Sequence, residues 1–238
     1  QNDKVVQTVG ACIARPKTDS HKGCPYSMQK QLLTHRDNPQ RRGNDMEIIG
    51  ITGQTGAGKS TICRALVTRG AYHIDADAVA KSLYCKGAPI LSKLQDAFGS
   101  QILTADGELV RPALAAAAFR DRDSTARLNA IVHPAVTEKI RAILDEQRKA
   151  GVQCVLIDAI ALFESGEAAL CDRTVGVIAP EAVRLARITA RDGLSEADAL
   201  LRIRAQHDES FYVSRCDDVI RNYPPYTLES EMQRVFPL

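Results

Sequence analysis

The feature that most constrains how this chain folds is a glycine-rich run at residues 48–61, which reads Ile-Ile-Gly-Ile-Thr-Gly-Gln-Thr-Gly-Ala-Gly-Lys-Ser-Thr. It contains the pattern G-x-x-x-x-G-K-[ST] directly after an expected strand and directly before an expected helix. Glycines let backbone N–H groups turn inward around phosphate oxygens, and the helix that follows adds its positive N-terminal dipole. The run therefore predicts a strand, a phosphate-binding loop of the Walker A type and a helix.

Side chains of this loop are expected to bind ATP and its metal ion. Lys59 can reach the β- and γ-phosphates, and the Ser60 hydroxyl is placed to ligate Mg²⁺, the cofactor that we expect. The loop alone does not distinguish a kinase from a switch or a motor, but the sequence lacks the Asn-Lys-x-Asp motif by which GTPase switches recognise their base. The residues expected to bind ATP are Gly53, Gly56, Ala57, Gly58, Lys59, Ser60 and Thr61.

Short β-branched runs that alternate with helical patterns predict the rest of the fold. Strands that alternate with helices form parallel sheets with helices on both faces. We therefore expect an α/β fold, a doubly wound parallel five-stranded sheet of the P-loop nucleoside-monophosphate-kinase type, with a helical acceptor-binding insert and a helical lid. The runs expected to be strands are Glu47–Thr52, Ala71–Ile74, Val152–Ile157, Thr174–Ala179 and Asp218–Ile220.

The sequence divides into an N-terminal stretch and one domain with two additions. Residues 1–45 are rich in Gln, Lys, Arg, Asn and Pro and have no sustained period, so we expect a flexible leader whose removal leaves activity unchanged. Residues 46–238 are expected to form the kinase domain. Its predicted parts are a core at 46–76 and 151–238, a helical acceptor subdomain at 77–150 and a lid at about 181–206.

Carboxylates follow two of the expected strands, at the sheet edge where open α/β folds bind their ligands. Asp75 and Asp77 should point to the same face of an extended chain, because alternate residues do so. One of them can accept a proton from, or orient, an attacking hydroxyl, although Asp77 could instead only cap a helix that begins at Ala78. Asp158 ends the third strand and could hold Mg²⁺ through water, or cap the next turn.

Three arginines follow the fourth expected strand. Arg184, Arg187 and Arg191 recur at spacings of three and four, which places them on one face of a helix. Such a face can close over ATP and offset the charge on the transferring phosphoryl group, whereas arginines on helices are otherwise usually solvated surface. With the phosphate-binding loop in the same chain, we expect a lid, in which Arg187 and Arg191 are the strongest catalytic candidates.

The pair His133-Pro134 is expected to open a helix that runs to about Lys149, because proline is favoured at the first position of a helix. The spacing alone leaves two roles open for His133. It can be a residue that forms local hydrogen bonds, or it can contact the substrate.

Charge and cysteine usage limit the environment and the partners. A formal net charge of +2 gives no basic patch for nucleic acid or an anionic membrane, so we expect neither partner. The seven cysteines are scattered and form no Cys-x-x-Cys pair, which is typical of reduced thiols in a cytoplasmic protein. We expect a monomer or a small homo-oligomer.

Taken together, these segments resemble the dephospho-coenzyme A kinase family over nearly all of residues 46–238. A chance match would not place so many motifs in the family's order. The motifs that carry the resemblance are Thr52-Gly53 through Thr61, Ile74-Asp75-Ala76-Asp77, Gly87-Ala88-Pro89 with Phe98-Gly99, Asp106-Gly107 with Arg111 and Leu114, Leu128-Asn129 with His133-Pro134, Leu162-Phe163-Glu164, Arg187 with Arg191-Asp192, Gln206, and Asp218 with Asn222.

The resemblance implies an activity and further roles. The family transfers the γ-phosphate of ATP to the ribose 3′-hydroxyl of dephospho-coenzyme A, the last step of coenzyme A synthesis. By the resemblance Asp77 is the candidate base, Arg111 and His133 contact the acceptor, and Arg187 and Arg191 belong to the lid. The chain departs from the family pattern where Ile160 replaces a proline, Arg184 a glutamine and Tyr223 a glycine.

Two other functions are alternatives to this one. A shikimate-kinase-like enzyme also pairs the glycine-rich loop with Asp-x-Asp after the second strand, but that family is shorter and lacks the long helical insert with His-Pro. An ATP-binding regulatory protein would not need the acceptor-side Asp77 or the arginines of the lid. The sequence therefore predicts a kinase for dephospho-coenzyme A.

Overall fold

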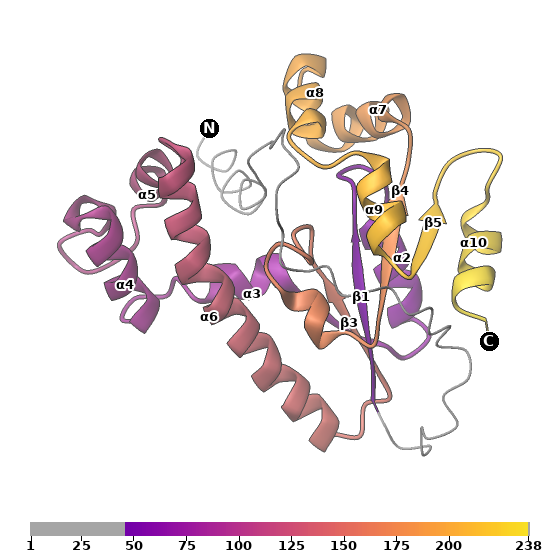
Figure 1. The fold of residues 1–238 in the computed structure, drawn as a ribbon, viewed down its shortest axis with the longest axis horizontal. Helices are drawn as coiled ribbons and strands as arrows, with labels where there is room; N and C mark the ends of the chain where they lie inside the picture. Colours follow the sequence, from indigo (N-terminus) through magenta and orange to yellow (C-terminus); the bar gives the residue numbers. More distant parts are fainter. Residues whose placement is uncertain (1–45, 238) are drawn as a thin grey trace.

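The computed structural model describes residues 46–237, whose centre is a five-stranded parallel sheet in the order β2-β3-β1-β4-β5 (Figure 1). The expected α/β fold with a parallel five-stranded sheet is confirmed, and each strand begins and ends within two residues of its predicted bounds. The leader predicted at residues 1–45 lies outside the described residues. The strands are β1 (Glu47–Gly53), β2 (Tyr72–Asp75), β3 (Cys154–Asp158), β4 (Arg173–Ile178) and β5 (Asp218–Arg221).

The sheet is buried on both faces because helices cover each side. Alternate residues of the strands face opposite ways. One set, which includes Ile51 and Leu156, packs against α2 (Lys59–Val67) and α10 (Leu228–Val235). The other set packs against the helices that join β2 to β3, and Ile178 of β4 packs against α9 (Glu209–Arg215). This is why the strands read as continuous apolar runs.

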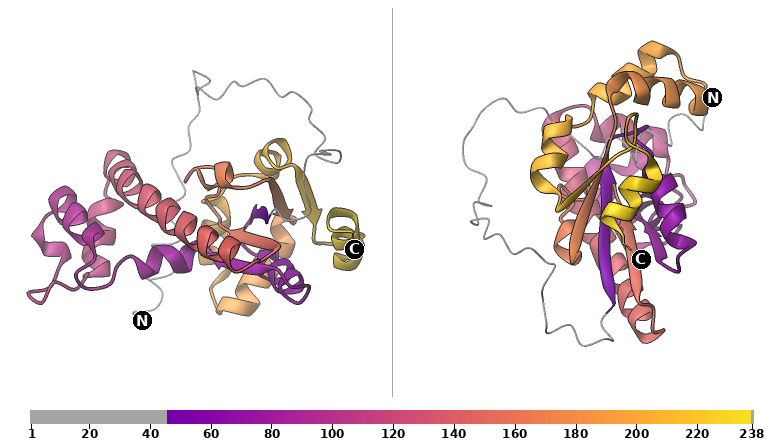
Figure 2. Two further views of the ribbon diagram at one scale, coloured as in Figure 1. Left: turned by 90° about the horizontal axis from the view of Figure 1, so that it is seen from below. Right: turned by 90° about the vertical axis from the view of Figure 1, so that its right-hand side faces the viewer.

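The segment between β2 and β3 is helical and extends to one side of the sheet (Figure 2). Its helices share a hydrophobic core of their own that continues into the sheet through Val155 and Ile157. No strand forms in this segment, as the sequence predicts; the only pairing there is an isolated bridge between Leu103 and Leu109. The helices are α3 (Ala76–Ser82), α4 (Pro89–Phe98), η1 (Ser100–Ile102), α5 (Arg111–Ala118) and α6 (Arg122–Lys149).

The helix expected to begin at His133-Pro134 begins earlier, so this prediction is wrong about its start. α6 begins at Arg122, where the Asp121 carboxylate accepts a hydrogen bond from the Ser124 N–H, and Pro134 lies inside the helix. Proline is costly in a helix because it removes one backbone hydrogen bond. Here Pro134 is exposed, while its neighbours Val132 and Val136 are buried, so packing of the opposite face maintains the helix.

The segment after β4 carries the helices that lie above the loop following β1. α7 (Glu181–Asp192) and α8 (Glu196–Arg204) form a pair joined by a short turn, and α9 leads into β5 (Figure 1). A short 3₁₀ helix, η2 (Glu167–Leu170), lies between β3 and β4. None of the helices within residues 46–237 is both long and apolar enough to cross a membrane.

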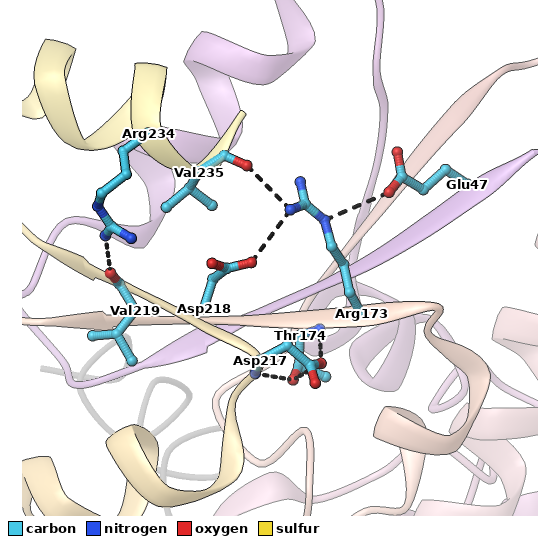
Figure 3. A network of polar contacts seen from close by, with 8 residues as sticks. All are labelled: Glu47, Arg173, Thr174, Asp217, Asp218, Val219, Arg234 and Val235. Atoms are coloured by element: carbon cyan, nitrogen blue, oxygen red, sulfur yellow. Dashed lines mark hydrogen bonds and ion pairs between the residues drawn. The ribbon is translucent and has the colours of Figure 1, made fainter. Parts of the chain in front are cut away.

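Charged side chains form ion pairs and hydrogen bonds at the edge of the sheet where the strands begin (Figure 3). The Arg173 guanidinium at the start of β4 lies 3.5 Å from the Glu47 carboxylate and 3.3 Å from that of Asp218, and it donates to the Val235 carbonyl at 3.1 Å. Arg234 donates to the Val219 carbonyl in the same network. The first residues of β1, β4 and β5 are thereby tied to α10.

Candidate active site

The glycine-rich loop takes the path that the motif predicts. β1 ends at Gly53 and α2 begins at Lys59, so the loop opens directly onto the N-terminus of a helix. Gly53 and Gly58 have φ angles of 134° and 105°, and a Cβ atom would clash with the Val177 backbone at the first and with the Asn222 side chain at the second. Glycine is therefore required at both positions by conformation and by space.

A cleft of about 420 Å³ lies at the carboxyl edge of the sheet, a size typical of small-molecule sites. Nine of the residues expected at the site line it together. They are Gly56, Gly58, Lys59, Ser60, Thr61, Asp77, Asp158, Arg187 and Arg191. Gly53 and Ala57 of the loop are not part of the lining, and their backbone carbonyls accept hydrogen bonds from Lys59 and from Arg187, respectively.

Lys59 has the position expected of a phosphate ligand. Its ammonium donates to the Gly53 carbonyl at 3.0 Å and lines the cleft. Burial lowers the pKa of Lys59, while the carboxylates of Asp158 and Asp77 act in the opposite direction. A phosphate chain in the cleft would supply the negative charge that favours the charged form of this ammonium.

The two carboxylates after β2 have different roles, which the sequence did not separate. β2 ends at Asp75, whose carboxylate accepts from the Ala78 N–H at 3.0 Å and caps α3. Both carboxylates line the cleft, as expected, but Asp77 lies in the first turn of α3 rather than in an extended segment, and the capping role considered for it is wrong. Since the cap is Asp75, the Asp77 carboxylate remains directed to the cleft.

Asp77 is electrostatically suited to accept a proton. Burial and the nearby Asp75 charge raise its pKa to about 6, although Lys59 acts against this rise. A general base works best when its pKa lies near the working pH, and most carboxylates are far more acidic than that. The fold therefore places a tuned carboxylate opposite the lysine of the phosphate-binding loop.

A second, smaller cavity of about 30 Å³ adjoins the cleft, and Asp77 and Ile160 line both. His133 and Glu167 line it as well. The Nε2 atom of His133 is buried and has no hydrogen-bond partner within residues 46–237, and burial lowers the pKa of the imidazole. Burial raises the pKa of Glu167 to about 7. Glu167 was not predictable from the sequence, because a single acid in η2 carries no spacing signal.

Asp158 and Ser60 provide a donor set that suits Mg²⁺. Both side chains line the cleft, and hydroxyl and carboxylate oxygens are the ligands that this hard cation prefers. The Asp158 carboxylate also lies 3.6 Å from the His73 Nε2 atom and 3.6 Å from the Cys63 Sγ atom. Within residues 46–237 the side-chain contacts of this carboxylate are with His73 and Cys63, so the alternative that it caps the turn after β3 finds no support.

The three arginines of α7 do not act alike. Arg187 donates to the Gly56 and Ala57 carbonyls at 3.4 and 3.3 Å, and Arg191, which pairs with Asp192, also lines the cleft. Arg184 is buried and donates through Nε to the Ala179 carbonyl at 2.9 Å, outside the lining of the cleft. The expectation that all three face ATP is wrong for Arg184, because the first turn of α7 packs against the end of β4.

Two polar side chains from distant segments hold the loop. The Gln206 carbonyl oxygen accepts from the Thr55 N–H at 2.6 Å, and the Asn222 amide donates to the Ala57 carbonyl at 2.7 Å. Both residues belong to the motifs that carry the family resemblance, but no role could be predicted for them from the sequence. Their function as supports becomes visible only when segments that are far apart in the chain meet.

Arg111 is the one expected acceptor contact that does not join the others. It begins α5, and its guanidinium lies 5.5 Å from the centre of the Tyr84 ring, outside the lining of both cavities. Two residues that depart from the family pattern make contacts of their own. The Ile160 carbonyl accepts from the buried Thr52 hydroxyl at 3.2 Å, and Tyr223 packs edge-to-face on Tyr226.

Comparison with known proteins agrees with this geometry. The sequence model of the dephospho-CoA kinase family matches residues 47–225. A dephospho-CoA kinase of Corynebacterium diphtheriae is 42% identical over 177 residues, which cover 74% of this chain and 88% of that protein. The enzyme of Moorella thermoacetica is also 42% identical, over 74% of this chain and 83% of its own length.

Solved structures show the same fold. A protein from Thermus thermophilus superposes with a TM-score of 0.65 at 32% identity, covering 80% of this chain and 94% of its own. Dephospho-CoA kinase from Campylobacter jejuni superposes with a TM-score of 0.56 at 24% identity, covering 78% and 92%. With the family model matching most of the chain and relatives matching along most of their length, the chain belongs to the dephospho-CoA kinase family.

Proposed function

We propose that this chain transfers the γ-phosphoryl group of ATP to the ribose 3′-hydroxyl of dephospho-coenzyme A and releases coenzyme A and ADP. Family membership supports the choice of substrates. One structural observation carries the proposal: Asp77, with its pKa raised to about 6, lines the same cleft as the lysine of the phosphate-binding loop. A nucleotide-binding protein without an acceptor has no need for that carboxylate.

The residues divide the reaction between them. Asp77 accepts the proton of the attacking hydroxyl, and Lys59, Arg187 and Arg191 offset the negative charge that spreads over the phosphoryl group as it moves. The backbone N–H groups of the loop at residues 53–58 hold the phosphate chain in place. Arg187 is already fixed by the loop carbonyls and the Asn222 carbonyl, so it needs little reorganisation when ATP binds.

Mg²⁺ is the metal that we propose for this site. Ser60 would bind it directly and Asp158 through water, and the ion would neutralise charge on the β- and γ-phosphates. The donor set supports this assignment, since both residues offer oxygen atoms to one cleft.

The acceptor is proposed to bind on the side of the helical segment at 77–150. His133 supports this, since it lines the small cavity together with Asp77 and its Nε2 atom has no hydrogen-bond partner among the described residues. Arg111 can contribute only if α5 or the Arg111 side chain moves toward the cleft, because it now stacks on Tyr84. The lid at about 181–206 supplies Arg187 and Arg191. This division into core, acceptor subdomain and lid is likewise a proposal.

We propose a cytoplasmic enzyme. The five cysteines within residues 46–237 are all free thiols, which is usual in a reducing compartment. A monomer or small homo-oligomer, and the absence of nucleic-acid and membrane partners, remain predictions from the composition.

An acceptor panel tests the proposed function. ADP release is measured with dephospho-coenzyme A, shikimate, adenosine or no acceptor, each with ATP and Mg²⁺, and the product is identified by mass. We expect release that depends on dephospho-coenzyme A and a product heavier by one phosphoryl group. Preference for shikimate or adenosine would make the chain a different metabolite kinase, and hydrolysis independent of acceptor would identify a regulatory ATPase.

A further inference from the structure

Three potential metal ligands meet beside the cleft, from three elements of the fold. Cys63 lies on α2, His73 on β2 and Asp158 at the end of β3. The ligand atoms of all three lie within 4.8 Å of one another, and the Asp158 carboxylate is 3.6 Å from both the Cys63 Sγ atom and the His73 Nε2 atom. Neither Cys63 nor His73 belongs to the motifs that carry the family resemblance. The family resemblance therefore assigns no role to the cluster.

The spacing agrees with a tetrahedral zinc site. Zinc binds sulfur at about 2.3 Å and nitrogen or oxygen at about 2.0–2.2 Å, so tetrahedral angles put its ligand atoms about 3.3–3.7 Å apart. The two distances of 3.6 Å fall in this range. A small inward movement of the His73 ring closes the remaining edge, and its half-exposed side chain has room to move. The mixture of thiolate, imidazole and carboxylate selects zinc over magnesium, which avoids sulfur.

We propose that Cys63, His73 and Asp158 form a Zn²⁺ site with an open fourth position toward the cleft. Zinc displaces the thiol proton of Cys63, which passes to solvent, and binds the resulting thiolate. The site borders the cleft, because Asp158 lines it. Three protein ligands and one open position also distinguish this site from the closed sites of structural zinc.

The position of the site gives it a regulatory consequence, and this part rests on the proposed function. Zinc on Asp158 withdraws the carboxylate that we assign to Mg²⁺. It also places positive charge near Lys59, whose ammonium is influenced by Asp158. Loss of this ligand and the added positive charge both oppose binding of the Mg²⁺ ion that accompanies ATP. Zinc therefore inhibits phosphoryl transfer, while Mg²⁺ at the Ser60 side of the cleft does not need Cys63 or His73.

Cobalt binding to the full-length chain tests the site without reference to activity. Co²⁺ replaces zinc in such sites and shows a thiolate-to-metal absorption band. Titration of the metal-free chain should give this band at one equivalent, and Zn²⁺ should abolish it. Cys63→Ser should remove the band, and His73→Gln should weaken binding by more than about tenfold. Cys154→Ser is the matched control, because Cys154 lies on the same strand as Asp158 but outside the cluster.

Three results would overturn the proposal. The band could be absent from the wild type, it could persist in Cys63→Ser, or it could be lost in Cys12→Ser or Cys24→Ser while Cys63 is intact. Circular dichroism confirms that each variant is folded. If Cys63→Ser fails to fold, His73→Gln decides alone, because its side chain is 32% exposed and its loss leaves the core intact. An unchanged cobalt affinity in His73→Gln then refutes the site.

Inhibition tests the consequence separately. Product formation is quantified directly, so that zinc acts on no coupling enzyme, with Mg²⁺·ATP held constant. Half-inhibition should require more than about tenfold more Zn²⁺ in Cys63→Ser than in the wild type or Cys154→Ser. Cobalt binding without inhibition would keep the site and refute its regulatory role. Binding in a chain without kinase activity would separate the site from the proposed function.

Discussion

The two edges of the central sheet use charged side chains in opposite ways. At the edge where the strands begin, Arg173 is placed between Glu47 and Asp218, so opposite charges satisfy one another (Figure 3). At the edge where the strands end, Lys59 and Asp77 line an open cleft. Burial lowers the pKa of Lys59 and raises that of Asp77, so it disfavours the charged form of both side chains. The first arrangement stabilises the fold, and the second keeps charge available for a ligand at a cost in stability.

The largest effect should come from removing the charge of Asp77. Asp77→Asn keeps the size of the side chain but removes the proton acceptor, so kcat should fall about 10²- to 10⁴-fold while ATP affinity changes little. Steady-state kinetics and ATP titration measure the two quantities. Asp96→Asn, which removes an exposed carboxylate from α4 outside the cleft, is the control and should behave as wild type. A kcat within a few-fold of wild type would reduce Asp77 to a structural residue.

The next effect should separate two arginines of one helix. Arg187→Met should lower kcat about 10²- to 10³-fold, because this guanidinium lines the cleft and is placed to meet charge that develops in the transition state. Arg184→Met should leave kcat within a few-fold, because Arg184 is buried outside the lining of the cleft. Steady-state kinetics of both variants compares them directly. Equal losses would show that the whole face of α7 acts on ATP.

At the other edge the effect should be on stability alone. Arg173→Met leaves Glu47 and Asp218 without their cation and should lower the free energy of unfolding by about 1–3 kcal/mol. Urea denaturation measures this loss, and kcat/KM of the folded variant should be unchanged. Arg148→Met is the control, because the exposed pair of Arg148 with Asp145 should contribute less than about 1 kcal/mol. A loss of kcat/KM in Arg173→Met would contradict the division between the two edges.

A stability effect of the opposite sign is expected at the cleft. Asp77→Asn should raise stability at pH 8 by up to about 3 kcal/mol, because the pKa of Asp77 is raised from 3.8 to about 6 in the folded protein. The folded state then binds more protons than the unfolded state between these values, so wild-type stability falls as the pH rises through that window. The gain should vanish near pH 4, where Asp77 is protonated. Urea denaturation at pH 8 and at pH 4 measures the difference in the free energy of unfolding. A variant less stable than wild type at pH 8 would show that burial of the Asp77 charge does not destabilise the fold.

Much of the fold was predictable, because its signals are local. The glycine-rich loop and the apolar runs of the strands are contiguous, and each has one favourable conformation. The start of α6 was not predictable from Pro134, since proline is favoured in the first turn of a helix and costly in its interior, where it lies here. The helix continues through Pro134 because Val132 and Val136 pack into the hydrophobic core, and this packing is not visible in any local sequence pattern.

The site was predictable as a set of residues but not as an arrangement. Asp77 and Lys59 were identified from motifs, yet the division of labour between Asp75 and Asp77 depends on where β2 ends and α3 begins. Burial of Arg184 and the bond from Thr55 to Gln206 depend on contacts between distant segments. For the same reason no spacing in the sequence indicates the cluster that includes Cys63.

The pH dependence of kcat/KM tests most directly whether Asp77 accepts the proton. In the wild type, kcat/KM should rise about tenfold per pH unit up to about pH 6, the pKa of Asp77 in the free enzyme, and then level off. The phosphate groups of the substrates titrate equally with both proteins, so the same measurement on Asp77→Asn isolates the side chain. The account predicts that the acidic limb attributable to Asp77 is lost in the variant. An identical limb in both proteins would contradict it.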